Sequence, residues 1–222
     1  MRLREIGLST EHTVAASPVW LRLVDIFTGR APAGRVSLQI ERRDGNQWRA
    51  VEIPYELKPS GDLAFVNLGR VARGQAGDQR EYRVTATADQ TVAEASGGGP
   101  SMVFSITTWS PDAPLPTPQI REIRCYPAPD YPYGPSVPVV SGTVVDQGTG
   151  NPVGRARVRV TETVLGNPLV EEVRTNDSGW FRVPLRWSSG ATDIEADRSG
   201  ASGSATINVP ADLGSVVSIT IS

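Results

Sequence analysis

The sequence has 222 residues, of which 39% are hydrophobic and 21% are charged, and its formal net charge is −2. This composition is too apolar for a disordered chain, and no stretch approaches the roughly 18 apolar residues that a membrane helix requires. The small negative charge argues against nucleic acid as a partner, because proteins that bind nucleic acid usually present a basic surface. We therefore expect a folded chain without membrane insertion, long enough for two domains of roughly 100 residues.

The N-terminal segment, "MRLREIGLSTEHTVAASPVW", lacks the apolar core and the small-residue cleavage site of a secretory signal. The sequence therefore predicts cytoplasmic synthesis without a signal peptide. The single histidine, His12, lies in this polar stretch and has no neighbours of the types that catalysis or zinc binding needs. We interpret it as a surface residue.

The first half of the chain contains segments in which apolar and polar residues alternate, a pattern typical of strands with one buried face. In the first of them, Val36, Leu38 and Ile40 are predicted to point inward. Turn signals such as Thr28-Gly29 separate the segments. The strands predicted in this half cover residues 36–40, 47–53, 63–68, 81–88 and 102–108.

Residues 109–138 differ in composition from the rest of the chain. Their nine prolines remove backbone donors and favour an extended conformation, so this segment is predicted to be a stiff connector. Its three tyrosines, Tyr126, Tyr131 and Tyr133, either pack on a neighbouring domain or offer a rigid aromatic surface to a partner. Both alternatives stay open. The imperfect alternation of "QIREIRCY", at 119–126, leaves an additional short strand open as well.

The second half of the chain repeats phrases of the first. "VDQGTGNPVGRARVRV", at 145–160, echoes "VDIFTGRAPAGRVSLQI", at 24–40. "DSGWFRVPL", at 177–185, echoes "PSGDLAFVNL", at 59–68. Because the two echoes occur in the same order, we interpret the chain as two tandem copies of one domain type.

The run "RARVRV" is the clearest strand of the second copy. Ala156, Val158 and Val160 are predicted to point into the core, and three arginines to the other face. These arginines are Arg155, Arg157 and Arg159. Further strands of this copy are predicted at 141–145, 170–175, 180–185, 193–197, 205–209 and 216–222.

Many short strands at regular spacing, with glycine-rich turns and no helical periodicity, predict β-sandwiches. The fold class is therefore all-β, with two tandem transthyretin/immunoglobulin-like antiparallel β-sandwiches joined by a proline-rich linker. The predicted domains are residues 1–108, a linker at 109–138, and residues 139–222.

The second copy resembles the carboxypeptidase regulatory-like domain, a small transthyretin-like β-sandwich. The resemblance covers residues 139–222, and the first copy is assigned by the internal echo. It implies a structural or adhesive module rather than a particular activity. The matching positions are Gly142, Asp146, Thr149, Gly150, Pro152, Val153, Gly154, Ala156, Thr175, Gly179 and Phe181.

No set of residues predicts catalysis, a metal site or a cofactor site. Cys125 has no second cysteine nearby and is interpreted as an inert thiol. Neighbouring acids such as Glu171 and Glu172 alternate with apolar residues, as on a solvated sheet face, so we do not assign them to acid–base chemistry.

Eight residues are candidates for a partner interface. The arginine stripe could instead be paired with glutamates on neighbouring strands, and the tryptophans could be buried in the sandwich. The candidates are Tyr126, Tyr131, Tyr133, Arg155, Arg157, Arg159, Trp180 and Trp187.

The function predicted from these features is that of a non-enzymatic structural or adapter protein in a multi-subunit assembly. The arrangement resembles regulatory-like-domain proteins associated with phage tails and tail-like contractile injection systems, which implies tail-tube, sheath or baseplate subunits as partners and incorporation into a particle. A homo-oligomer is left open. The alternatives are a module that binds carbohydrate or a cell surface through exposed aromatics, and an accessory domain pair of a separately encoded enzyme.

Overall fold

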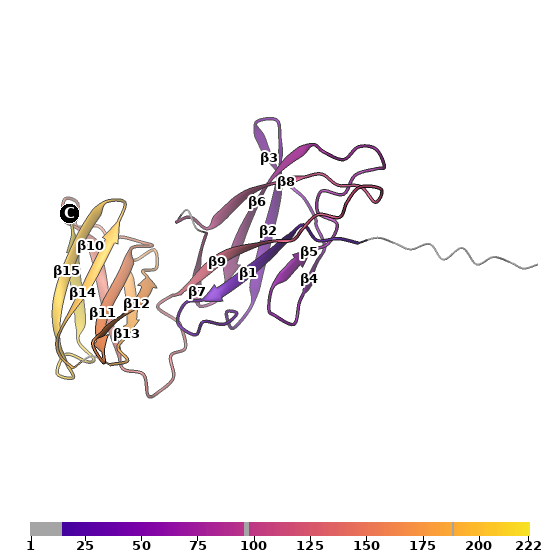
Figure 1. Ribbon diagram of the computed structural model, residues 1–222. Coiled ribbons are helices and arrows are strands. Elements are labelled where there is room, and N and C mark those ends of the chain that lie inside the picture. Colours follow the sequence, from indigo (N-terminus) through magenta and orange to yellow (C-terminus); the bar gives the residue numbers. More distant parts are fainter. Residues whose placement is uncertain (1–14, 96–97, 188) are drawn as a thin grey trace, which may run out of the picture. The chain divides into compact units, whose positions relative to one another are not determined.

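The computed structural model describes residues 15–95, 98–187 and 189–222, and these residues form sixteen β-strands and no helix (Figure 1). The prediction of an all-β chain with sandwich-like folds is confirmed. The first nine strands are β1 (Val19–Asp25), β2 (Val36–Asp44), β3 (Gln47–Ala50), β4 (Tyr55–Leu57), β5 (Leu63–Phe65), β6 (Gln79–Ala88), β7 (Thr91–Ala95), β8 (Ser101–Thr107) and β9 (Gln119–Pro127). The others are β10 (Val139–Asp146), β11 (Arg157–Val164), β12 (Asn167–Arg174), β13 (Trp180–Pro184), β14 (Gly190–Arg198), β15 (Ala201–Val209) and β16 (Val216–Ile221).

The nine N-terminal strands belong to one sheet, in the order β3-β2-β6-β7-β9-β1-β5-β4, with β8 paired to β6. The chain divides into two compact units that cut through several of these strands. The first unit contains residues 15–21, Ile40–Tyr82 and Val103–Arg121. The second unit contains Arg22–Gln39, Arg83–Met102 and Glu122–Ser222.

The first unit has an aromatic core. The rings of Tyr82 and Phe104 are stacked with centroids 6.0 Å apart, and Phe65 of β5 is fully buried. The indole of Trp109 is buried as well and donates a hydrogen bond to the carbonyl oxygen of Leu68 at 2.9 Å. A buried tryptophan N–H needs such an acceptor, so this contact fixes the chain where the predicted connector begins.

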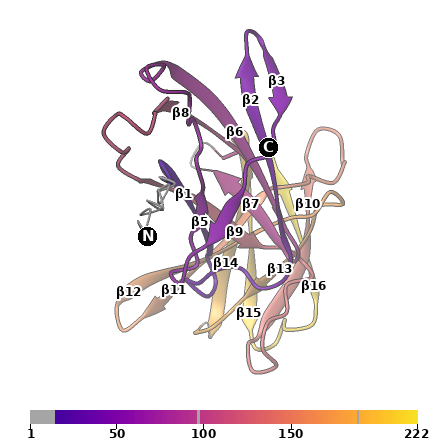
Figure 2. The ribbon, with the colours of Figure 1, turned by 90° about the vertical axis from the view of Figure 1, so that its right-hand side faces the viewer.

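Strands β10–β16 of the second unit form two sheets, in the orders β13-β10-β16 and β12-β11-β14-β15. Figures 1 and 2 show β14 and β15 side by side, and they pair antiparallel along their whole length. The pairing of β10 with β16 is parallel. The fully buried core between the sheets consists of Val140, Val144, Ala156, Val158, Val160, Val173, Phe181, Val183, Leu185, Ile194, Ala196, Ile207, Ile219 and Ile221.

The alternation in the sequence predicts these strand faces correctly. Ala156, Val158 and Val160 are fully buried, and Trp180 is half-exposed on the face opposite the buried Phe181. The predictions are wrong at some strand ends, since β3 ends at Ala50 and does not continue to residue 53. Strands β1, β4 and β7 were not predicted; β4 has only three residues and lies between Pro54 and Pro59.

Part of the predicted connector is a strand. Residues 119–127 form β9, whose residues Cys125 and Tyr126 lie opposite Ala93 and Val92 of β7. The alternation of this stretch is imperfect because its last three residues, 125–127, are all buried. The boundaries 1–108, 109–138 and 139–222 stay a prediction.

The repeated phrase of the sequence folds into the same turn twice. Gly29 and Gly150 both have a φ of 68°, and each donates its amide to the carbonyl oxygen of the aspartate four residues earlier at 2.8 Å. The carboxylates of Asp25 and Asp146 accept turn amides, from Phe27 in the first copy and from Thr149 in the second, again at 2.8 Å. Only glycine adopts this φ without strain, so the echo between the copies is explained by one backbone geometry.

The residues that carry the family resemblance hold the second sandwich together. Thr175 donates its hydroxyl to the carbonyl oxygen of Val153 at 2.7 Å and accepts the amide of Ala156 at 2.8 Å. Gly154 has no room for a side chain, because a Cβ there would lie 2.9 Å from the Cα of Asp177. The motif is therefore structural: its residues close the turn after β10 against the hairpin that leads into β13.

Candidate interaction surface

The described residues contain no group of three or more histidine, cysteine or acidic side chains that could hold a metal ion. Cys125 is fully buried, and this burial raises the pKa of its thiol to about 11. The thiol is therefore protonated at neutral pH and unsuited to nucleophilic attack. His12 lies outside the described residues.

Two of the three connector tyrosines, Tyr126 and Tyr131, are buried in the second unit. The hydroxyl of Tyr131 donates to the carboxylate of Asp25 at 2.6 Å. The rings of Tyr131 and Tyr133 both meet Phe27 edge-on, with centroids 5.6 and 5.0 Å away. Burial and the carboxylate of Asp25 raise the pKa of Tyr131, so its hydroxyl stays a donor. These rings pack within the chain, and whether Tyr133, which is half-exposed, also contacts a partner stays a prediction.

An ion pair between the partly exposed Arg186 and the buried Glu171 lies beside this aromatic cluster. Arg186 donates from Nε to the carboxylate of Glu171 at 2.6 Å and from Nη2 to the carbonyl oxygen of Phe27 at 2.7 Å, and its guanidinium lies 4.0 Å from the centre of the Phe27 ring. A second buried carboxylate, that of Glu162, accepts the backbone amides of Arg186 and Trp187. The pKa of Glu171 is raised to about 7, mainly by burial. The positive charge of Arg186 lowers this pKa, and the negative charge of Glu162 raises it. The sequence placed Glu171 on a solvated sheet face; it is 7% exposed, because its strand packs against the segment after β13.

The raised pKa of Glu171 predicts a stability that depends on pH. The folded chain holds this proton up to about pH 7, whereas an unfolded glutamate releases it near its ordinary pKa of 4.5. The free energy of unfolding should therefore decrease by about 3 kcal/mol as the pH rises through this window. In the variant Glu171→Gln the unfolding free energy should not fall with pH in this way. In the control Glu195→Gln, where the replaced side chain is exposed, the fall should remain. Urea denaturation at pH 5 and pH 8 measures the difference, and equal slopes in all three proteins would contradict the prediction.

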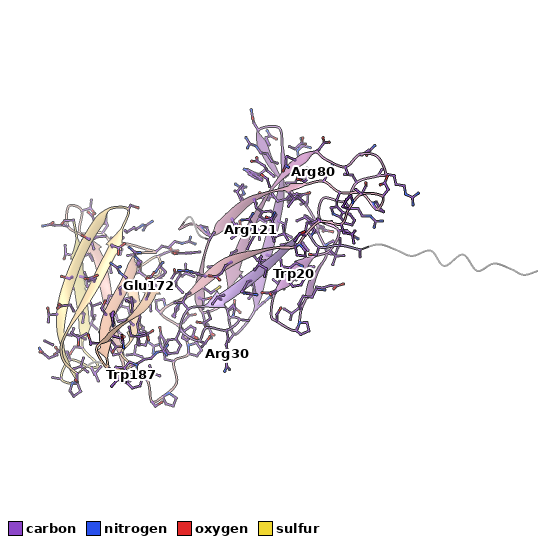
Figure 3. All side chains as sticks on the ribbon, viewed as in Figure 1. Trp20, Arg30, Arg80, Arg121, Glu172 and Trp187 are labelled. Carbon is purple, nitrogen blue, oxygen red and sulfur yellow. The ribbon has the colours of Figure 1, made fainter. Side chains whose placement is uncertain are left out.

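A second buried cluster is centred on Arg174, whose side chain is 5% exposed. Its guanidinium binds the carboxylate of Glu94 through two hydrogen bonds of 2.6 Å and that of Glu172 through one of 2.7 Å. It also lies 3.7 Å from the centre of the Tyr126 ring. Tyr126, predicted as a partner contact, is thus buried under this arginine. Figure 3 labels Glu172 on β12.

The predicted arginine stripe is mostly neutralised by the neighbouring strand. Arg157 binds the carboxylate of Asp197 through Nε and Nη2, at 3.0 and 2.9 Å, and Arg159 lies 3.2 Å from Glu195. Arg155 is not part of this strand face. It precedes β11 in a turn, with a φ of 57°, and is exposed.

Four exposed apolar side chains of the second unit lie on or beside the β11–β12 hairpin. β11 pairs with β12 from residue 157 to residue 164, but with β14 only from 157 to 160, so the outer half of the hairpin separates from β14. Leu165 at its tip is 97% exposed. Val170 and Leu169 on β12 are 49% and 37% exposed.

Trp187 extends this apolar surface. It is 60% exposed and lines a hollow of about 420 Å³ together with Thr161 and Thr163. These threonines are the pairing partners of Val170 and Pro168 on the hairpin. Figure 3 shows Trp187 near the lower ends of the strands of this sandwich. We call Leu165, Leu169, Val170 and Trp187 the hairpin surface. The sequence predicted only Trp187; the apolar run "VLGNPLV" was the signal for the others.

The described residues include no helix with the length and apolar character needed to span a bilayer.

Comparison with solved structures finds pilus proteins. The ancillary pilin of Streptococcus is 15% identical, with 95% of this chain and 63% of the pilin aligned and a TM-score of 0.34. The shaft pilin SpaA of Lactobacillus rhamnosus GG is 9% identical over 93% and 96% of the two chains, with a TM-score of 0.27. The basal pilin SpaE of the same organism is 10% identical over 89% and 86%, with a TM-score of 0.30. Scores this low carry no conclusion about the role of this chain.

No curated protein sequence is significantly similar to the chain. The model of one protein family matches it, over the region that the turn and hairpin motifs indicated. Residues 139–222, which contain strands β10–β16, match the model of the carboxypeptidase regulatory-like domain.

Proposed function

We propose that this protein is a non-enzymatic structural subunit that binds other proteins of an assembly through the hairpin surface. The observation that carries the proposal is the exposed apolar tip of the β11–β12 hairpin, where Leu165 is 97% and Val170 is 49% exposed. An exposed apolar patch lowers the solubility of a protein unless a partner covers it. A docking partner would cover these side chains.

The assembly that we propose is a phage-tail-like contractile particle, with tail-tube, sheath or baseplate proteins as partners. This finer assignment rests on the resemblance of the sequence. The regulatory-like domain at 139–222 supports only the coarser role of a structural module.

The carbohydrate-binding alternative has less support in the described residues. A glycan platform needs clustered exposed aromatics, but Tyr126 and Tyr131 are buried and Trp180 is half-exposed. Trp187 is the one aromatic side chain of the hairpin surface.

Substitution of the hairpin tip tests the proposal. The variant Leu165→Asp/Leu169→Asp should lose at least about 90% of the partner retained by the wild type, because each charge must be buried against an apolar partner. Leu57→Asp is the matched control, since Leu57 is an exposed leucine of β4 in the other unit, 71% exposed. Affinity capture from the host lysate, mass spectrometry and negative-stain imaging give the readout. The proposal is supported if the wild type and Leu57→Asp capture particle proteins and the double variant does not. Equal capture by all three proteins, or a wild type that captures no partner, contradicts it.

A further inference from the structure

Arginines surround a cavity at the end of the β11–β12 pair that lies away from the hairpin tip. The cavity has a volume of about 420 Å³ and joins a second one of the same size, since both are lined by Glu94, Gly98, Arg157 and Arg174. The further residues of the first cavity are Arg155, Asp197, Arg198 and Ser199. Its four arginines face the carboxylates of Glu94 and Asp197, and Glu172 binds Arg174 as well, so the arginines exceed these carboxylates by one.

The excess charge belongs to Arg155 and Arg198. Arg157 is neutralised by Asp197, and Arg174 by the two glutamates that it binds. In the described part of the chain, neither Arg155 nor Arg198 forms an ion pair, and both are exposed. Arg198 donates to the backbone carbonyl oxygen of Gly154. This bond holds its guanidinium against the turn that contains Arg155.

The backbone at Arg155 supports a role in binding. Its φ of 57° is a conformation that glycine adopts more readily, so arginine is not the residue that the fold prefers there. The first copy places a Gly-Arg pair at the same point of the repeat, but there the positive φ of 88° is at Gly34 and Arg35 is unstrained. A strained residue that the fold does not require is a reason to look for a ligand.

We propose that this cavity binds an acidic segment of a partner protein, with Arg155 and Arg198 as the residues that contact its carboxylates. A guanidinium presents a planar pair of donors that matches a carboxylate. A chain with a net charge of −2 repels a long polyanion such as nucleic acid, but two unpaired arginines attract a segment with a few carboxylates. The inference rests on the proposed role as a protein-binding subunit and names the chemistry of one partner segment.

Binding of a fluorescein-labelled hexaglutamate peptide, followed by fluorescence anisotropy at low ionic strength, tests the inference. Arg155→Gly should weaken binding by about tenfold, because one charge-assisted contact is lost. Arg155→Glu should weaken it by about tenfold or more. Arg155→Lys should weaken it by less, because the charge is retained. Arg155→Gly should unfold at the same or a higher temperature, because it removes the strain. The matched controls Arg35→Glu and Arg35→Gly make the same changes at the equivalent position of the first copy and should bind like the wild type.

Three results would overturn the inference. In the first, the wild type binds hexaglutamate no more tightly than hexaglutamine. In the second, the Arg35 variants bind hexaglutamate as weakly as the Arg155 variants do. In the third, the wild type binds a labelled oligothymidylate more tightly than hexaglutamate. The proposed function is tested separately: if the Leu165→Asp/Leu169→Asp variant loses its partners while hexaglutamate does not bind, the subunit role stands and the arginine site does not.

Discussion

The variant Gly142→Ala should lose about 3 kcal/mol of unfolding free energy, because β10 has no space for one more methyl group. β10 is the middle strand of its sheet, between β13 and β16, and Gly142 is paired to Phe181 on one side and to Val217 on the other. A Cβ at this position would overlap the carbonyl oxygen of Val217 and lie 2.5 Å from the Phe181 ring. The carbonyl oxygen of Val217 belongs to the backbone, so this clash is relieved only if a strand moves.

Gly148→Ala is the control for this prediction. Gly148 lies in the turn after the same strand, has no positive φ, and would place its Cβ no closer than 3.5 Å to another heavy atom. Its unfolding free energy should change by less than about 0.5 kcal/mol. Urea denaturation followed by tryptophan fluorescence measures both variants. Adding Phe181→Leu to Gly142→Ala should recover little stability, because the strand contact persists; full recovery would show that the ring alone excludes the side chain.

Removal of the buried guanidinium should have the second large effect: Arg174→Ala is expected to lower the free energy of unfolding by about 3 kcal/mol. The substitution leaves the carboxylates of Glu94 and Glu172, only 15% and 18% exposed, without their shared cation. It also removes the planar group that covers the ring of Tyr126. Two neighbouring negative charges then remain in a site that water hardly reaches.

The control is an ion pair of equal length on the surface. Arg43 and Glu81 are also 2.6 Å apart, but their side chains are 48% and 38% exposed, so Arg43→Ala should change the stability by about 0.5 kcal/mol or less. Comparison of the two variants separates burial from distance. A loss below about 1 kcal/mol for Arg174→Ala would contradict the prediction and would mean that burial adds little to this ion pair.

The site could be predicted only in part. Trp187 and Arg155 were among the eight candidate residues, because an aromatic residue after a strand and an arginine in an alternating run are visible in the sequence. Burial of Tyr126 and Tyr131 could not be read from it, since their neighbours Arg174 and Asp25 are distant in the chain. The exposed hairpin tip was missed for a similar reason: the sequence does not show that β11 separates from β14 beyond residue 160.

The sequence by itself determined the features that depend on neighbouring residues. These are the all-β class, the inward faces of strands such as β11, and the left-handed turns at Gly29 and Gly150, because alternation and backbone sterics act within a few residues. Only the tertiary structure decided which charges are neutralised and which stay free. Arg174 and Glu94 are separated by 80 positions, and their contact forms only when the strands that carry them have found their places. Among the described residues Arg155 has no ion pair, because it lies in the turn before β11, whereas the β11–β14 register places Asp197 and Glu195 opposite Arg157 and Arg159.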